Sequence, residues 1–206
     1  MRCYEIFGKR TFDLFFSLLA LVLFFPLFLL LGILIKLDSK GPVFFMQKRM
    51  GKNGILFSLI KFRTMYVDVE REKLFYEPGS IDRVTLLGRI LRRTKLDELP
   101  QIINVLKGDM SFVGPRPEVP KYKHYYEGEY KSVLDVKPGI SDEASIKYIC
   151  EEETLVGCQK PEKYYEETLL PDKLKINLGY VKNKLSLKGD MEIVAKTLRN
   201  LLWEKR

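Results

Sequence analysis

The feature that most constrains this chain is an uncharged apolar run near its N-terminus. The run extends from Leu14 to Ile35, contains Ser17, Gly32 and Pro26, and has no charged residue. Because a helix rises about 1.5 Å per residue, a straight helix of this length could cross a bilayer. A cleaved signal peptide fits poorly, since the run is too long and no small-residue cleavage site follows it. The sequence therefore predicts a membrane-embedded helix.

The charges around this run predict how the helix meets the membrane. Basic residues lie on both sides of it: Arg2, Lys9 and Arg10 before, and Lys36, Lys40, Lys48 and Arg49 after. Because basic residues stay on the cytoplasmic side, a single crossing would leave one basic flank on the wrong side. Pro26 removes a helical hydrogen bond near the middle and favours a break. We expect a re-entrant helix that enters and leaves by the cytoplasmic face, with a kinked single span as the alternative.

The rest of the chain is long enough to form a domain with its own core. We expect residues 1–40 to be membrane-embedded and residues 41–206 to form a cytoplasmic domain. The formal net charge of +8 indicates an acidic partner: nucleic acid, anionic lipid or a phosphorylated substrate. Cys3, Cys150, Cys158 and His124 show no metal-ligand spacing, and they indicate a reducing compartment rather than a disulfide framework.

A β-hairpin is expected directly after the membrane segment. Residues 43–49 and 55–64 have strand character, and Gly51 to Gly54 form the turn between them. Period-two alternation places Lys61 and Arg63 on one face of the second strand. Two cations spaced in this way can hold a phosphate together. A charged strand edge that only keeps the sheet soluble is the alternative.

The remaining segments predict a mostly helical fold. Val84, Leu87, Ile90 and Leu91 fall at helical spacing among arginines, so this helix is expected on the lipid surface, with core packing as the alternative. Residues 66–79 are interpreted as a loop or mobile helix, and residues 150–168 as acidic and irregular. Helices are expected over 171–182 and 190–203, the second capped by Gly189-Asp190. The expected class is α/β, mostly α, with a short hairpin and amphipathic interfacial helices.

The segment from Arg92 to Gln101 has the strongest chemical character. Pro100 suits a first helical turn, so a helix is predicted from about Leu96 or Asp97 to Gly108. Asp97 and Glu98 would then lie at the positive end of the helix dipole, where carboxylates stay ionised. Downstream, Arg116 stands between two prolines that stiffen its loop. The alternative for Asp97 is a capping box that begins at Thr94 and requires no chemistry.

Six motifs occur in order along the chain: Lys9-Arg10 with Asp13, the apolar run with Pro26, Asp38 to Phe45, Lys61 to Met65, Leu96 to Gln101, and Gly108 to Pro117. Together they resemble the bacterial sugar transferase family, the monotopic phosphoglycosyl transferases. The resemblance is close over about residues 9–140 and looser beyond. Two segments depart from the pattern common in that family. Phe25-Pro26 replaces Ser-Pro, and the segment from Ser141 to Ile146 replaces a Thr-Gly segment.

The resemblance implies an enzyme of the cytoplasmic face of the bacterial inner membrane. It implies transfer of a sugar phosphate from a UDP-sugar to a polyprenyl phosphate such as undecaprenyl phosphate, with release of UMP. It also implies Mg²⁺ and a covalent aspartyl intermediate. The family's catalytic pair corresponds to Asp97, the expected nucleophile and metal ligand, and Glu98. Its arginines correspond to Arg92 and Arg116, to which we add Lys61 and Arg63 as hypothetical phosphate ligands.

Two other functions compete with this one. A non-catalytic membrane scaffold would explain the apolar segments, but it would leave two carboxylates beside arginines unexplained. Nucleic-acid binding is not expected, because the basic residues cluster around amphipathic and membrane segments and no recognition motif is present. The expected partners are therefore a UDP-sugar, a polyprenyl phosphate and membrane lipids. The sequence predicts neither the sugar nor the oligomeric state.

Overall fold

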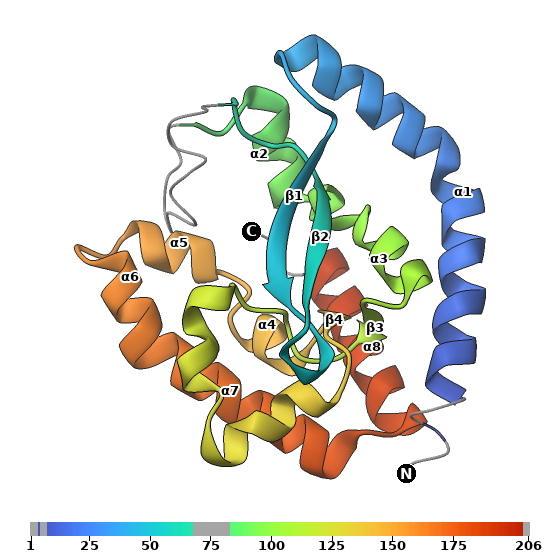
Figure 1. The fold of residues 1–206 in the computed structure, drawn as a ribbon. Helices are drawn as coiled ribbons and strands as arrows, with labels where there is room; N and C mark the ends of the chain where they lie inside the picture. Colours follow the sequence, from blue (N-terminus) through green and yellow to red (C-terminus); the bar gives the residue numbers. More distant parts are fainter. Residues whose placement is uncertain (1–3, 5–7, 68–82, 204–206) are drawn as a thin grey trace.

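The computed structural model describes residue 4, residues 8–67 and residues 83–203. A long helix runs along one side of the molecule, a β-hairpin lies at its centre, and the C-terminal helices pack below and beside the hairpin (Figure 1). The predicted class, a mostly helical domain with a short hairpin and a long apolar N-terminal helix, is confirmed. The loop or helix predicted over 66–79 lies almost wholly outside the described residues.

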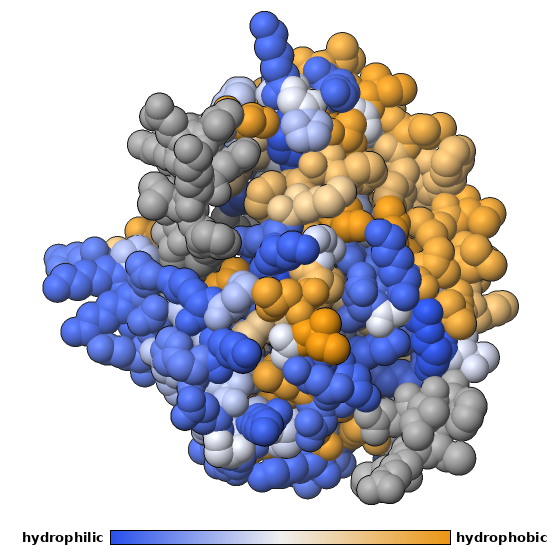
Figure 2. Space-filling model, in the orientation of Figure 1, coloured by the Kyte–Doolittle hydropathy of each residue, from blue (hydrophilic) through white to orange (hydrophobic). Residues whose placement is uncertain are grey.

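Helix α1 (Lys9–Asp38) contains 30 residues and continues through Pro26. Within the described residues it is the helix long and apolar enough to cross a membrane. Its apolar side chains are largely exposed, and they form the apolar surface on the α1 side of the molecule (Figure 2). Such a large exposed apolar surface indicates contact with a membrane. The re-entrant course stays a prediction, and the predicted domain boundary at residue 40 falls between α1 and the first strand.

Strands β1 (Phe44–Met50) and β2 (Leu56–Phe62) form the predicted antiparallel hairpin. A short 3₁₀ turn, η2 (Lys52–Gly54), joins them, and Asn53 and Gly54 both have positive φ there. The register pairs Phe45 with Lys61, so Lys61 lies near the α1 end of the hairpin.

Helix α2 (Leu86–Arg93) begins at Thr85, whose side chain caps it by accepting a hydrogen bond from Gly88 N. A side chain at Gly88 would collide with the backbone carbonyl of Thr64, so glycine permits α2 to pack closely on the chain after β2. Leu91 is buried, whereas Leu86 and Ile90 are exposed. The predicted amphipathic helix is therefore confirmed, and its contact with lipid stays a prediction.

The segment around the two carboxylates differs from the prediction. Instead of one helix from residue 96 to Gly108, a 3₁₀ turn, η4 (Leu96–Glu98), precedes helix α3 (Gln101–Lys107). Pro100 lies at the N-cap of α3 because its ring has no N–H to continue a hydrogen-bond ladder across it. Gly108 ends α3 in the left-handed conformation, as predicted. Asn104 fastens α3 to β2 by accepting from Ile60 N and donating to Ser58 O.

Two short parallel strands follow, β3 (Ser111–Val113) and β4 (Gly139–Ser141). The 3₁₀ segments η5 (Pro120–Tyr125) and η6 (Gly128–Asp135) connect them. Because Gly114 N donates to Ser141 O, the Arg116 loop that leaves β3 lies beside the end of β4.

The C-terminal region is helical almost throughout. Its elements are α4 (Glu143–Lys147), α5 (Glu151–Val156), α6 (Pro161–Tyr164), the π-helical η7 (Tyr165–Leu169), α7 (Leu170–Gly179), the π-helical η8 (Tyr180–Lys184) and α8 (Leu187–Trp203). The prediction of an irregular segment over 150–168 is wrong, because α5, α6 and the start of η7 lie within it and Leu155 and Tyr165 enter the main core. The predicted cap at Gly189-Asp190 is also wrong. Helix α8 begins earlier, and the Asp190 side chain binds Lys9 and Tyr180.

Candidate active site

Asp97 and Glu98 lie in η4, directly after Lys95, which has a positive φ. Lys61 Nζ on β2 lies 2.7 Å from Glu98 Oε1 and 4.0 Å from Asp97 Oδ2. Arg116 Nη2, from the loop after β3, lies 2.9 Å from the same Glu98 oxygen. Two cations from different elements therefore share one oxygen of Glu98, and Asp97 lies beside them.

The two adjacent carboxylates have opposite electrostatic properties. Burial raises the pKa of Asp97, and the attraction of Lys61 only partly opposes this. Burial would also raise the pKa of Glu98, but Arg116 and Lys61 outweigh it and hold that pKa well below its ordinary value. The ionised form of Glu98 is thus favoured beside its two cations. Asp97 Oδ1 is buried and has no hydrogen-bond partner among the residues that the structure describes.

The structure brings three of the four predicted cations to this site. Besides Lys61 and Arg116, Arg92 on α2 contributes a positive charge that favours the ionised form of Asp97, while its Nε donates to Thr64 Oγ1. Arg63 lies elsewhere. Its Nη2 donates to Ile35 O at 3.2 Å and to Ser39 O at 2.6 Å, at the end of α1. Arg63 follows the last residue of β2, where the chain leaves the strand that carries Lys61.

A divalent cation fits the site through Asp97. Mg²⁺ is commonly held by one or two carboxylates together with substrate phosphates, so a cage of protein ligands is not needed. No group of three or more metal-binding side chains occurs in the described part of the chain. The buried, unpartnered Oδ1 of Asp97 is the oxygen that such an ion would use. Glu98 is less suitable, because its Oε1 already binds Lys61 and Arg116.

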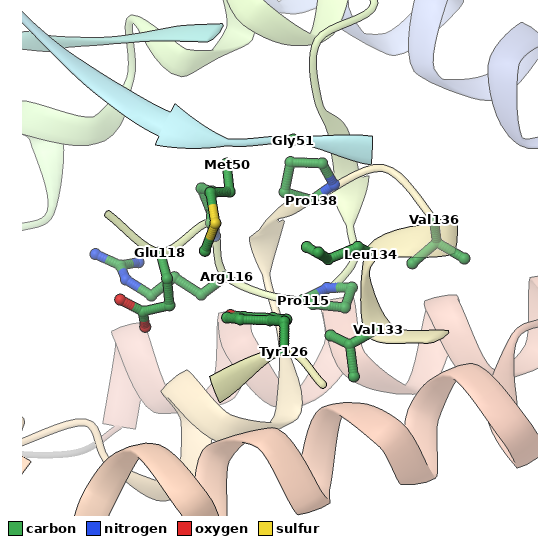
Figure 3. A pocket seen from close by; sticks show the side chains of 11 residues that line it. Met50, Gly51, Pro115, Arg116, Glu118, Tyr126, Val133, Leu134, Val136 and Pro138 are labelled. Carbon is green, nitrogen blue, oxygen red and sulfur yellow. The ribbon is translucent and has the colours of Figure 1, made fainter. Parts of the chain in front are cut away.

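Sequence reasoning missed two carboxylates near Arg116. Glu118 is buried and lies two residues beyond Arg116, and both side chains extend to the same side of a small pocket (Figure 3). Asp142 caps α4 through Ser145 N, and its Oδ2 is buried without a partner. Glu118 could have been found from the sequence, because it directly follows Pro117 at the end of the Arg116 loop. Asp142 had none, because only the pairing of β3 with β4 brings it near.

An apolar groove lies between α1 and the hairpin. It encloses about 780 Å³, and its lining includes Phe25, Phe28, Gly32, Val43 and Phe44. Three of these residues, Phe28, Val43 and Phe44, pack in the same apolar cluster as Leu96 and Leu99. Since these two leucines flank Asp97 and Glu98 in the chain, the groove and the turn that carries the carboxylates pack against the same buried cluster.

The sequence of the chain is similar to those of several known transferases. The family profile described as "Bacterial sugar transferase" matches residues 4–204. A UDP-glucose:undecaprenyl-phosphate glucose-1-phosphate transferase of Caulobacter vibrioides is 36% identical over 197 residues, which cover 94% of this chain and 69% of that protein. A UDP-N-acetylgalactosamine-undecaprenyl-phosphate N-acetylgalactosaminephosphotransferase of Aeromonas hydrophila is 37% identical over 95% of this chain, but this covers only 44% of that protein.

A third relative is matched over a shorter stretch of this chain. The putative undecaprenyl-phosphate N-acetylgalactosaminyl 1-phosphate transferase of Bacillus subtilis is 43% identical over 121 residues, covering 59% of this chain and 68% of that protein. Because the family profile covers nearly the whole chain and the similarity extends along most of it, the chain belongs to the bacterial sugar transferase family.

Proposed function

We propose that this chain transfers a sugar-1-phosphate from a UDP-sugar to undecaprenyl phosphate and releases UMP. The names of its relatives combine undecaprenyl phosphate with a sugar phosphate. The observation that carries the proposal to this chain is Asp97 Oδ1, which is buried beside Lys61 and has no hydrogen-bond partner among the described residues. The turn that carries it packs against the same apolar cluster as residues of the groove. A nucleophile, a charge-neutralising cluster and a lipid-compatible surface are the three parts that such a reaction needs.

The proposed reaction proceeds in two displacements at the same phosphorus. Asp97 attacks the phosphorus next to the sugar, the bond from this phosphorus to the bridging oxygen breaks, and the electron pair leaves with UMP. An oxygen of undecaprenyl phosphate then attacks that phosphorus and returns the carboxylate of Asp97. Neither step requires a net proton transfer. A bound Mg²⁺ supplies further neutralisation of the phosphate charge.

The remaining side chains position and neutralise rather than transfer protons. Lys61 and Arg116 are fixed by Glu98 and present positive charge where the diphosphate would lie. The lowered pKa of Glu98 supports a role as an ionised holder of these cations, because a carboxyl that stays charged at neutral pH is a poor proton donor. Arg92 adds positive charge on the α2 side.

The contacts of α1 support a re-entrant course on the cytoplasmic face of the inner membrane. Near its start, Arg10 donates to Val105 O at 2.7 Å and to Leu106 O at 2.9 Å, and Lys9 binds Asp190. Near its end, Arg63 binds Ile35 O. Both ends therefore contact the same folded body, whereas a helix that spanned the bilayer would place them on opposite sides.

The groove beside α1 suits the polyprenyl chain of the acceptor. It is apolar, it adjoins the exposed apolar surface of α1, and Lys36 lies at its lining as a cation for an anionic head group. Its packing against the cluster that contains Leu96 and Leu99 would bring a lipid phosphate toward Asp97.

A screen for UMP release tests the proposal. Purified protein would be incubated with individual UDP-sugars, undecaprenyl phosphate and Mg²⁺, and UMP and the lipid product would be measured. Intact-protein mass spectrometry without the acceptor should show an adduct of one sugar phosphate. No UMP with any UDP-sugar would contradict the proposal and favour a non-catalytic membrane scaffold.

A further inference from the structure

A buried ionic cluster lies around Glu118, two residues beyond Arg116 in the chain. Lys173 of α7 is 3% exposed, and Glu118 is 6% exposed. Lys173 Nζ lies 3.5 Å from Glu118 Oε1 and 3.0 Å from Glu151 Oε2. Tyr165 OH donates to Glu118 Oε1 at 2.6 Å and accepts from Lys173 Nζ at 3.1 Å. Every charged group in this cluster thus has an opposite partner.

The cluster fastens one end of the loop that carries Arg116. On the hairpin side, Met50 N donates to Glu118 O at 2.9 Å, and Arg49 Nη1 donates to Pro117 O at 3.1 Å. On the helical side, Lys173 and Tyr165 hold the Glu118 side chain. The loop is therefore clamped between the hairpin and α7 immediately after Arg116. Figure 3 shows Arg116 and Glu118 extending side by side from this loop.

A structural role alone explains this cluster poorly. Burying ions costs desolvation free energy that their attraction barely offsets, so apolar side chains of similar size would stabilise the fold as well or better. What the ions add is a defined position. Pro115 and Pro117 restrict the backbone around Arg116, so a displacement of Glu118 is transmitted to Arg116 rather than absorbed by the loop. Arg116 Nη2 must stay within 2.9 Å of Glu98 Oε1 for the cation cluster to form.

We propose that Lys173 is a positioning residue for Arg116: through Glu118 it sets where the Arg116 guanidinium lies relative to Glu98 and the substrate diphosphate. The C-terminal helices thereby become part of the site, although they contribute no group that touches substrate. Without Lys173, the carboxylates of Glu118 and Glu151 would lose the cation that they share, and the positive charges left near Glu118 would include Arg49 and Arg116. The inference rests on the proposed function, because the role of Arg116 is defined by the diphosphate.

A double-mutant cycle tests the proposal. Lys173→Met keeps most of the side-chain volume and removes the charge. We expect it to lower kcat/KM for the UDP-sugar by about tenfold to 100-fold, the effect of a misplacement of about 1 Å. In an Arg116→Ala background the same change should cost less than about twofold, because the residue through which Lys173 acts is already gone. Lys173→Arg should restore most of the activity.

Controls separate positioning from general destabilisation. Lys182→Met removes an exposed lysine, paired with Glu129 at 3.1 Å, and should leave kcat/KM unchanged. If Lys173→Met does not fold, Glu118→Gln supplies the second cycle, since it keeps a hydrogen bond to Tyr165 and removes the charge. Equal fold losses in the wild-type and Arg116→Ala backgrounds, in either cycle, would overturn the positioning role.

The same experiment distinguishes this inference from the proposed function. A wild-type protein that releases no UMP contradicts the proposed function. An active wild-type protein with additive losses contradicts only the role of Lys173. UDP affinity measured by calorimetry across the same four proteins provides a readout that does not depend on turnover. We expect Lys173→Met to weaken UDP binding only when Arg116 is present, and equal weakening in both backgrounds also overturns the inference.

Discussion

Asp97 and Glu98 are adjacent in the chain, but their surroundings shift their pKa values in opposite directions. Asp97 is buried with one oxygen unpartnered, and burial raises its pKa. Glu98 holds two cations, and its pKa is lowered. A carboxyl group with a raised folded-state pKa destabilises the fold when it is ionised, whereas a carboxyl group with a lowered pKa stabilises the fold. At neutral pH, ionised Asp97 thus lowers the free energy of unfolding and ionised Glu98 raises it. A destabilising group is expected at a site where activity requires it.

Asp97→Asn should therefore abolish activity and stabilise the protein at once. The neutral amide keeps the shape, cannot attack phosphorus, and removes a buried charge. We expect no UMP release, no covalent adduct by mass spectrometry, and a melting temperature higher by about 2–4 °C at neutral pH. The gain should shrink as the pH falls through the raised pKa of Asp97, where the wild-type carboxyl is neutral too. An adduct that persists in Asp97→Asn would disprove the assignment of the nucleophile.

Glu98→Gln should have the opposite effect on stability. It leaves Lys61 and Arg116 without their shared anion, so we expect a loss of about 1.5–3 kcal/mol in the free energy of unfolding, measured by denaturant titration in detergent. The stabilisation by Glu98 is present above the ordinary carboxyl pKa and is lost as the pH falls through its lowered value. The difference between wild type and Glu98→Gln should accordingly vanish only at strongly acidic pH. A difference that disappears near neutral pH would contradict this.

The acid limb of the pH–rate profile should belong to Asp97. Because the nucleophile must be ionised and its pKa is raised, kcat/KM should decline at a higher pH than for an ordinary aspartate. Removing Lys61, which opposes the rise, should move this limb further toward neutral pH. Steady-state rates of Lys61→Met between about pH 4 and 8 check this. An acid limb that does not move would show that another group controls it.

Arg116 is expected to act in the transition state as well as in the ground state. Arg116→Ala removes one charge-assisted contact to the diphosphate, so kcat/KM should fall by about tenfold to 150-fold. Lys121→Ala is the matched control, because Lys121 is a basic residue that binds Glu162 and does not contact Asp97 or Glu98 in the contacts described above. Unchanged kinetics in Arg116→Ala would exclude it from the site.

At the scale of elements, the site depends on how closely α1, α2 and α3 approach the hairpin. Gly88 lets α2 lie against Thr64, and Asn104 binds α3 to β2. These contacts bring Arg92 and the carboxylate pair to the same end of the hairpin as Lys61. Gly32 on α1 has a different consequence. It leaves the groove wall open, because an added Cβ would meet only Val43 at an ordinary 3.7 Å.

Filling the groove should impair the lipid acceptor selectively. Gly32→Phe projects a ring into the groove without a backbone collision, so the KM for undecaprenyl phosphate should rise by about tenfold. Formation of the covalent adduct from the UDP-sugar should stay unchanged, since that step precedes the lipid. Val22→Phe, at an exposed position of α1 outside the groove lining, is the control. An equal loss in adduct formation would contradict this use of the groove.

At the scale of the whole molecule, α1 is fastened at both ends to a single body. Arg10 binds the end of α3, Asp13 accepts hydrogen bonds from Ser111 and Phe112, and Arg63 binds the end of α1. These polar contacts fix the helix at its ends, while its middle exposes apolar side chains. A helix held in this way is suited to enter one leaflet and return.

Cysteine labelling checks this topology. In intact spheroplasts, a membrane-impermeant maleimide should label none of Cys3, Cys150 and Cys158. After permeabilisation, Cys150, which is exposed, should label together with Cys3. A Cys3→Ser variant assigns the N-terminal signal. Labelling of Cys3 before permeabilisation would place the N-terminus outside the cytoplasm and contradict the re-entrant course.

Local features of the sequence were sufficient to predict the hairpin, the amphipathic α2 and the long apolar α1. Alternation, turn glycines and an uncharged run act within a few residues, so their outcome needs little information from the rest of the chain. The motifs around Asp97 and Pro115 identified the family for the same reason, since each is contiguous. Local reasoning was wrong over residues 150–168, where core packing of Leu155 and Tyr165 overrides an acidic composition.

The arrangement of charges was decided only by tertiary structure. Lys61 and Arg63 look equivalent along a strand, yet one binds Glu98 and the other binds the end of α1. Asp97 and Glu98 look equivalent in a turn, yet their pKa values shift in opposite directions. Lys173 carries no local signal at all. In each case the outcome depends on which distant group shares the low-dielectric interior, because burial and Coulomb attraction act through space and not along the chain.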